Sequence, residues 1–378
     1  MLKNILITGG AGFIGSNIAL KLVAQGRNVT VLDNLTKQIH GENPEKSPLY
    51  CSIKDKVRFI RGSVTDRFVF EKSLEKQDVV IHLAAETGTG QSMYEIEKYC
   101  STNIGGTALL LDILANKKNS IKKVIVAESR AIYGEGKYKC DDCGIVYPNS
   151  RTEKDMLAGD FRVKCPKCNK VVKLVATDEE SKLHPTSVYG ITKQIQGQLV
   201  HCVCHALGIA SVSFRYQNVY GPGQSLKNPY TGILSIFSNS LRQNNDINIF
   251  VDGTESRDFV FIDDVADATI LSIDNEKCSG FSFNIGTETS IDVITIANKL
   301  KDFYKSNSNI KISGNFRLGD IRHNYADITL AKKILGYEPK YDFEKGLSKF
   351  CNWVMTQPIE EDNYNNSLVE MKEKGLYK

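Results

Sequence analysis

Near the start of the chain the sequence reads Thr8-Gly9-Gly10-Ala11-Gly12-Phe13-Ile14-Gly15. A short apolar run, Asn4–Thr8, leads into this segment, and the residues that follow, Phe13–Ala24, have the spacing of a helix. In a turn between a strand and a helix, the first glycine permits the tight bend. Gly12 then lets the backbone approach a pyrophosphate, and Gly15 lets helix and strand pack closely. Because the first N–H groups of the helix are free to bind an anion, the segment predicts a dinucleotide-binding unit.

Asp33 ends the next predicted strand, Asn28–Asp33, and lies 18 residues after Gly15. At that position a carboxylate accepts hydrogen bonds from the hydroxyls of the cofactor's adenosine ribose. The same negative charge repels a 2′-phosphate, so the sequence predicts NAD rather than NADP as the cofactor.

Strands and helices continue to alternate along the first part of the chain. Apolar runs typical of strands fall at 57–61, 78–83, 123–127 and 210–215, and helical patterns fall at 99–116 and 189–207. Near-continuous apolar strands separated by helices indicate a parallel sheet that is covered on both faces. The sequence therefore predicts an α/β fold with a Rossmann-type, doubly wound parallel sheet.

This alternation is interrupted from residue 137 to residue 176, where Cys, Lys and Asp are frequent and no regular apolar period exists. After Pro222 the pattern becomes mixed, which indicates a smaller α+β part for the substrate. The predicted organisation is an NAD-binding Rossmann domain at 1–136 and 177–223 with a return around 258–285, a four-cysteine zinc-ribbon insertion at 137–176, a nucleotide-sugar substrate domain at 224–257 and 286–357, and a peripheral tail at 358–378.

Composition excludes several classes of protein. The 48 basic and 44 acidic residues give a net charge of only +4, so neither a nucleic-acid nor a membrane partner is expected. No apolar run is long enough to span a membrane, and no signal peptide precedes the first predicted strand. Ten cysteines without an export signal are expected to be reduced thiols or metal ligands in a cytoplasmic enzyme.

Three residues form a candidate catalytic set. Tyr189 and Lys193 are four residues apart on a predicted helix and therefore share one face. A neighbouring ammonium group is expected to lower the pKa of the phenol, so that Tyr189 acts as general base on a carbinol. Ser129, which follows the strand at 123–127, is placed to hydrogen-bond the same substrate hydroxyl.

With these motifs, the sequence resembles the extended short-chain dehydrogenase/reductase family, and within it the nucleotide-sugar epimerases and dehydratases. The resemblance covers about residues 2–353 apart from the insertion. It rests on Thr8–Gly15, Asp33, His82-Leu83-Ala84-Ala85, Asn103, Ser129, Tyr133-Gly134, Tyr189 and Lys193, Arg215–Pro222, Arg257-Asp258-Phe259 and Gly319-Asp320-Ile321-Arg322.

The resemblance implies an NAD site and a site for a nucleotide-diphosphate sugar. The residues implied for NAD are Gly9, Gly12, Phe13, Ile14, Gly15, Asp33, Asn34, Ser63, Val64, Leu83, Ala84, Ala85, Asn103, Tyr189 and Lys193. The residues implied for the substrate are Gln91, Ser92, Ser129, Arg130, Asn218, Arg257 and Arg322. Ser63 departs from the family pattern, which usually has Asp there, so a contact with the adenine amine is expected to be missing.

The residues after Ser129 favour one reaction of the family. Dehydratases carry an Asp-Glu pair there for elimination, whereas this chain has Arg130 and Ala131. Family reductases usually prefer NADPH, which Asp33 opposes. What remains is a redox-neutral 4-epimerase that works through a transient 4-keto sugar. The segments 88–94 and 225–232 and the cysteine insertion resemble one subgroup, the dTDP-L-rhamnose 4-epimerases, which make dTDP-6-deoxy-L-talose.

Several alternatives stay open: a 4-epimerase of the UDP-glucose/UDP-galactose type, a nucleotide-sugar 4,6-dehydratase, or a non-catalytic NAD-binding protein whose insertion binds a partner. The resemblance also implies a homodimer formed through the helices at 99–116 and 189–207.

The insertion contains two Cys-x-x-Cys turns, Cys140-Asp141-Asp142-Cys143 and Cys165-Pro166-Lys167-Cys168, separated by 21 residues. Each turn directs two sulfurs at one point, and two such turns complete a tetrahedron of thiolates. We therefore expect a structural zinc ion, because four thiolates leave no open coordination position. Iron in a rubredoxin-like site and free thiols are the alternatives.

Overall fold

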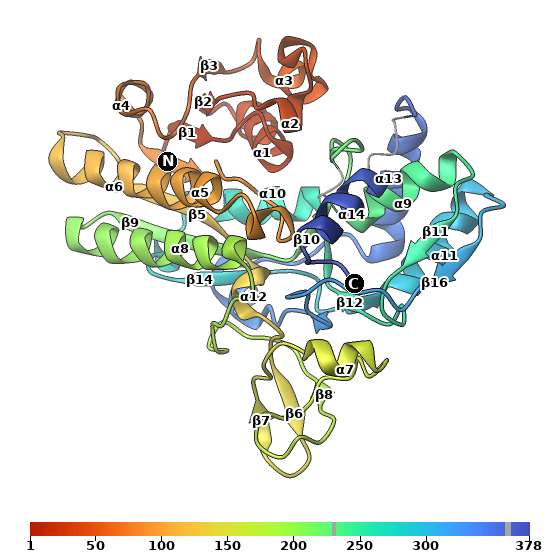
Figure 1. Ribbon diagram of the computed structural model, residues 1–378. Coiled ribbons are helices and arrows are strands. Elements are labelled where there is room, and N and C mark those ends of the chain that lie inside the picture. The colour runs from red at the N-terminus through yellow and green to blue at the C-terminus, as the bar shows by residue number, and fades with distance from the viewer. Residues whose placement is uncertain (229–231, 360–363) are drawn as a thin grey trace.

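The computed structural model describes residues 1–228, 232–359 and 364–378. Its centre is a sheet of seven parallel strands in the order β14-β9-β5-β4-β1-β2-β3 (Figure 1). The strands are β1 (Asn4–Thr8), β2 (Asn28–Asp33), β3 (Arg58–Arg61), β4 (Val79–His82), β5 (Lys123–Ser129), β9 (Ala210–Tyr216) and β14 (Ser282–Ile285). The strand order reverses between β1 and β4, and ligands bind doubly wound sheets at that switch point.

Helices cover both faces of this sheet, because its strands are apolar on both sides. One face packs on α1 (Phe13–Ala24), α10 (Ile262–Leu271) and α12 (Thr329–Leu335), and the other packs on α4 (Arg67–Leu74), α6 (Gly106–Asn116) and α8 (Val188–Leu207). Short helices α2 (Lys37–His40) and α3 (Pro48–Ile53) follow β2. The predicted parallel, Rossmann-like sheet with helices on both faces is thus confirmed.

The helix expected at 99–116 is not continuous. It begins as α5 (Ile96–Tyr99), passes through a π-helical turn at Cys100–Gly105, and continues as α6. The extra residue in this turn lets the Asn103 side chain bond back to the loop after β4: its amide donates to the Glu86 carbonyl at 3.1 Å, and its oxygen accepts from the Glu86 N–H at 2.8 Å. Such π-turns often lie at functional sites.

The mixed pattern after Pro222 forms small sheets around a second core. Strand β10 (Asn218–Tyr220) pairs with β13 (Phe259–Phe261), and β11 (Ile247–Ile249) pairs with β16 (Ile310–Ile312). A third sheet orders its strands as β15 (Ile291–Asp292), β12 (Ser256–Arg257) and β17 (His323–Asn324). Helices α9 (Ile233–Arg242), α11 (Val293–Tyr304) and α13 (Phe343–Met355) complete this core.

The insertion projects from the body of the molecule as the yellow-green segment at the bottom of Figure 1. It consists of β6 (Tyr138–Cys140), β7 (Gly144–Val146), α7 (Glu153–Leu157) and β8 (Lys173–Leu174). Its two ends meet, since the Lys137 N–H donates to Thr177 Oγ1 at 3.2 Å and the Val175 N–H donates to the Lys137 carbonyl at 3.2 Å. The outer half has a small core of its own, whereas α7 lies against the rest of the molecule.

The C-terminal tail forms α14 (Tyr364–Glu373) and then runs antiparallel to residues 316–318. Phe316 and Lys378 exchange two backbone hydrogen bonds of 2.9 and 3.0 Å. Met371 on α14 is only 2% exposed. The tail, placed at the periphery by the sequence, is therefore attached to the loop before Arg322. Among the described residues, no helix is both long and apolar enough to cross a membrane.

Candidate active site

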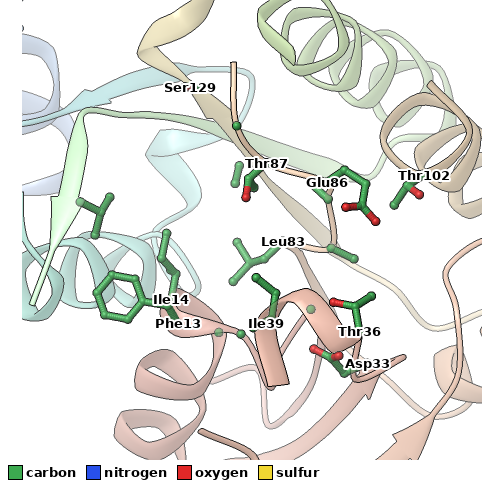
Figure 2. A pocket seen from close by; sticks show the side chains of 18 of the residues that line it. Phe13, Ile14, Asp33, Thr36, Ile39, Leu83, Glu86, Thr87, Thr102 and Ser129 are labelled. Carbon is green, nitrogen blue, oxygen red and sulfur yellow. The ribbon is translucent and has the colours of Figure 1, made fainter. Parts of the chain in front are cut away.

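A cavity of about 430 Å³ lies at the carboxyl ends of β1, β2, β4 and β5, where the strand order reverses. Figure 2 shows Phe13 and Ile14 on one wall, and Glu86 and Thr102 together on the other. Most residues that the sequence assigned to NAD line this cavity: Gly9, Gly12, Phe13, Ile14, Gly15, Asp33, Asn34, Ser63, Val64, Leu83, Ala84, Ala85, Tyr189 and Lys193.

The glycine loop is packed so tightly that side chains are excluded. Gly9 has φ +67°, and a Cβ there would lie 2.8 Å from the backbone of Ala84. A Cβ on Gly15 would lie 2.4 Å from the Gly9 carbonyl oxygen. No side chain caps the start of α1 at Gly12, so the first N–H groups of this helix lack intrahelical partners and face the cavity. This geometry fits a pyrophosphate.

Asp33 is held firmly at the edge of the same cavity. Its Oδ2 accepts from the Ala11 N–H at 3.0 Å, and its Oδ1 accepts from the Leu35 N–H at 2.8 Å. Figure 2 places the carboxylate beside Thr36. A fixed carboxylate in this position fits a ribose with free hydroxyls and opposes a phosphate in their place. The Asp33 carboxylate and the uncapped N-terminus of α1 together therefore fit NAD.

Two other predicted cofactor residues, Val64 and Asn103, differ in whether they line the cavity. Val64 is buried and lines the cavity, together with Ser63, whose hydroxyl lies 2.8 Å from that of Thr65. Asn103 does not line the cavity. Its side chain is fully buried and joins Glu86 to Thr192 Oγ1, to which it donates at 2.9 Å, so it holds the cavity wall rather than facing the cofactor.

The predicted catalytic residues lie on one wall, where β5 ends and α8 begins. Ser129, Tyr189 and Lys193 all line the cavity. Helix α8 is fixed there by two hydrogen bonds: the Ser187 hydroxyl caps it by accepting from the Gly190 N–H at 3.1 Å, and Ser92 Oγ accepts from the Tyr189 N–H at 3.1 Å. The Lys193 ammonium donates to the Ala127 carbonyl at 2.9 Å.

The electrostatics of this wall differ in part from the expectation. Burial raises the pKa of the Tyr189 phenol, while a hydrogen bond with Ser129 and the charge of Arg130 lower it by less. The spacing of Tyr189 and Lys193 in the sequence predicted that Lys193 lowers this pKa, but Lys193 is not among the groups that shift it. Burial also lowers the pKa of Lys193 itself to about 8, although the nearby Glu128 carboxylate acts in the opposite direction. Tyr189 is therefore a protonated phenol, and it can act as a base only when a bound group lowers its pKa enough for it to lose this proton.

The predicted substrate residues fall into two groups. Ser129, Arg130 and Asn218 line the cavity, and Arg130 Nε donates to Asn218 Oδ1 at 2.6 Å. The other four lie outside its lining. Gln91 and Ser92 are buried within the loop after β4, Arg257 bonds to the Asp320 carboxylate, and Arg322 bonds to Asp252 and Thr254.

A second, smaller cavity of about 50 Å³ adjoins the first, and Arg130 lines both. Its walls include Met93 from the loop after β4, and Met371 and Leu376 from the C-terminal tail. These tail residues are not predictable from the sequence, because the tail is polar and no motif marks it. Glu128, which is buried beside Lys193 and pairs with Arg215 at 3.0 Å, was not predicted either. A charged residue in an otherwise apolar strand is the signal that identifies such a pair.

The four cysteines of the insertion meet at one point. The sulfurs of Cys140, Cys143, Cys165 and Cys168 all lie within 4.8 Å of one another, and those of Cys140 and Cys168 are 3.5 Å apart. A tetrahedral zinc site with Zn–S bonds of about 2.3 Å places its sulfurs about 3.8 Å apart. Gly144 and Asn169, which directly follow the two turns, have φ of +72° and +59°. The donor set fits a closed tetrahedral metal site.

Comparison with known proteins identifies the class of this chain. A family model described as the NAD dependent epimerase/dehydratase family matches residues 5–152 and 166–286. The chain belongs to this family, as the sequence motifs indicated.

Individual relatives agree with the family. A dTDP-L-rhamnose 4-epimerase of Burkholderia thailandensis is 34% identical over 363 residues, which cover 96% of this chain and 97% of that protein. The UDP-glucose 4-epimerase of Thermotoga maritima, solved with UDP-glucose, is 31% identical with a TM-score of 0.75, covering 93% of this chain and 98% of that one. The UDP-glucuronic acid 4-epimerase of Bacillus cereus, solved with UDP-glucuronic acid and NAD, is 25% identical with a TM-score of 0.75 and the same coverage.

These similarities confirm the prediction of an enzyme, an NAD-dependent nucleotide-sugar epimerase.

Proposed function

We propose that the chain inverts C4 of a nucleotide-activated sugar and that Ser129, Tyr189 and Lys193 perform this reaction. The observation that carries the proposal is their common position on one wall of the cavity that fits NAD. Arg130 and Ala131 follow Ser129 directly, so no acid and base stand there for an elimination of water. The presence of Arg130 and Ala131 at these two positions favours an epimerase over a 4,6-dehydratase.

In this proposal Tyr189 takes the proton of the C4 hydroxyl, while Ser129 holds the same oxygen by a hydrogen bond. NAD, when bound, supplies the acceptor for the hydride that leaves C4 and the donor that returns it. Lys193 lies on the same wall as Tyr189, and in the loaded site its ammonium group would add positive charge that favours the deprotonated phenol. After the sugar has turned, Tyr189 returns its proton to the C4 oxygen, so protons and electrons balance and no external reductant is consumed.

For the substrate, we propose dTDP-L-rhamnose, converted to dTDP-6-deoxy-L-talose. The Burkholderia thailandensis relative of that name matches along nearly the whole chain. Met93, Met371 and Leu376 form the apolar part of the smaller cavity's wall, and this part suits the C6 methyl group of a 6-deoxy sugar. The charged part of the wall is formed by Arg130, Arg317 and Asp320. UDP-glucose is the second candidate, because the relative from Thermotoga maritima carries that name.

A screen by nuclear magnetic resonance tests both parts of this proposal. Purified protein with catalytic NAD is incubated with dTDP-L-rhamnose, UDP-glucose and UDP-glucuronic acid, and the C4 proton signals are followed. Inversion of dTDP-L-rhamnose without a change of mass is the expected result. A loss of water would show a dehydratase, and NAD binding without any turnover would show a non-catalytic protein.

For the insertion, we propose one structural zinc ion held by Cys140, Cys143, Cys165 and Cys168. The insertion's own core has few large side chains, so metal binding would contribute on the order of 10 kcal/mol to its folding. Protein purified under reducing conditions without chelator is expected to carry about one zinc per chain. Cys165→Ser is expected to lose the metal and become protease-sensitive between 137 and 176, while still binding NAD. Stoichiometric iron, with its red colour, or no metal at all would contradict the proposal.

We also propose that two copies associate through α8 and the segment from α5 to α6. On these elements Ile96 and Ile191 are 51% and 45% exposed. Light scattering is expected to give the mass of a dimer, and Ile191→Lys is expected to shift it to that of a monomer.

A further inference from the structure

The inner half of the insertion is bound to the substrate part of the molecule. Met156 and Phe161 of the insertion form one apolar cluster with Val251 and Phe316. The rings of Phe161 and Phe316 meet edge to face with centroids 6.5 Å apart. Figure 1 shows α7 at this inner end, close to the C-terminus. The insertion is therefore docked at a fixed position, beside the loop that leads to Asp320.

Arg151 is the polar residue at this junction, and it is almost completely enclosed. Its side chain is 4% exposed, and Nη2 donates to the Asp320 carbonyl at 3.0 Å. Its Nε lies 3.5 Å from the carboxylate of the fully buried Glu135, whose other oxygen accepts from the Arg322 N–H at 2.9 Å. The Nη1 atom of Arg151 has no hydrogen-bond partner among the described residues, and Nε has only its ion pair with Glu135. Arg151 lines neither of the two cavities, so an ordered water is the partner that fits the buried Nη1 donor.

Asp320 connects Arg151 to the cavities. Its two carboxylate oxygens accept from Arg257 and from Arg317, each at 3.1 Å. The charges of Arg317, Arg257, Arg151 and Arg130 hold the pKa of Asp320 at about 2, so it is ionised at neutral pH. Asp320 and Arg317 line the smaller cavity together with Arg130.

Positive charge is concentrated around Asp320. Four arginines, Arg130, Arg151, Arg257 and Arg317, are close enough to lower its pKa, and Arg130 and Arg317 line the smaller cavity together with it. Concentrated positive charge of this kind is stabilised by a doubly charged anion, and guanidinium groups match phosphate oxygens in geometry.

We infer that the insertion completes the substrate site through Arg151, a positioning residue that fixes the loop at 319–322 and, through Asp320, holds Arg317 toward a diphosphate at the smaller cavity. This inference rests on the proposed function for the identity of the ligand as a nucleotide-activated sugar. It gives the insertion a role in substrate affinity that is separate from its metal site.

The test measures binding of dTDP and UDP, which carry the diphosphate without a sugar, to the NAD-loaded protein by calorimetry. Arg151→Met keeps the length of the side chain but removes the charge and the donors, and it is expected to weaken dTDP binding at least tenfold. Arg151→Lys keeps the charge but cannot span Glu135 and Asp320, so an intermediate loss is expected. Arg162→Met is the matched control, because Arg162 lies in the same insertion, is 63% exposed and pairs only with Asp160 among the described residues.

The kinetic signature separates positioning from a general loss of structure. Arg151→Met is expected to raise KM about tenfold while kcat changes less than about threefold and NAD affinity stays that of the wild type. If proteases cleave the insertion of Arg151→Met more readily than that of the wild type, the dTDP affinity and KM of the Arg151→Lys protein are used instead to test the role of Arg151.

Nucleoside-diphosphate affinity equal to that of the wild type, in whichever of these variants is folded, would overturn the inference. Tight dTDP or UDP binding by a wild-type protein that inverts no sugar would instead refute only the proposed function.

Discussion

Replacing Tyr189 with Phe removes a single hydroxyl group, and the structure indicates that little else changes. The ring stays in place because α8 is capped by Ser187 and because Ser92 Oγ accepts from the backbone N–H of residue 189. The lost interactions are then the hydrogen bond with Ser129 and the proton transfer itself. General acid–base catalysis contributes a factor of about 10²–10⁴ in rate, so kcat is expected to fall by that factor. This fall corresponds to an activation free energy that is higher by about 3–5 kcal/mol.

The assay follows C4 inversion by nuclear magnetic resonance at saturating substrate, with NAD affinity measured separately by calorimetry. Tyr189→Phe is expected to bind NAD as the wild type does, within about twofold, while turnover falls. Turnover within about threefold of the wild type would refute the assignment of the base. A parallel loss of NAD binding would show that the hydroxyl holds the cavity together instead.

Three further predictions concern the cofactor, the pH dependence of stability and the tail. Asp33→Ala is expected to narrow the preference for NAD over NADP, measured by calorimetry; equal affinity of the wild type for both cofactors would contradict the role of the carboxylate. Burial raises the pKa of Glu179 to about 7, so the folded protein binds more protons than the unfolded chain between about pH 4.5 and 7, and stability falls as the pH rises through this window. Glu179→Gln is therefore expected to raise the free energy of unfolding by about 3 kcal/mol at pH 8 and to change it little at pH 4.5, as measured in urea; an equal effect at both pH values would disprove this cause. Met371→Lys places a second charge beside Arg130 and is expected to lower kcat/KM at least tenfold with NAD affinity unchanged, whereas Val369→Lys, on the same helix but 59% exposed, is expected to leave it unchanged.

Local sequence was sufficient to predict the dinucleotide-binding part. The glycines before α1 and Asp33 at the end of β2 act over short stretches of chain, so their spacing predicted that they would lie together, and the structure places them along one cavity. Ser129 at the end of β5 and Tyr189 in the first turn of α8 were predicted in the same way. These features depend on backbone geometry that a strand, turn and helix impose on any sequence.

Properties that depend on long-range packing were not predictable in this way. The pKa of Tyr189 is set mainly by burial, which a spacing of four residues between two side chains does not reveal. Asn103 and Ser92 were assigned to ligands, yet their side chains are occupied by Glu86, Thr192 and Tyr189 of the protein itself. The smaller cavity is lined by both Met93 and Met371, which are about 280 positions apart in the sequence, and no local pattern predicts that they meet.

The meeting of the insertion's two ends at Lys137 and Thr177 has an evolutionary consequence. A segment that leaves and re-enters a fold at one point can be gained in a single event, because the flanking backbone need not move to admit it. Its docked side chains impose the opposite constraint. Because Phe161 packs on Phe316, a substitution that changes the size of one ring is expected to require a compensating change in the other. A chimera carrying a related insertion is therefore expected to fold well only when the residues at positions 251 and 316 are exchanged with it.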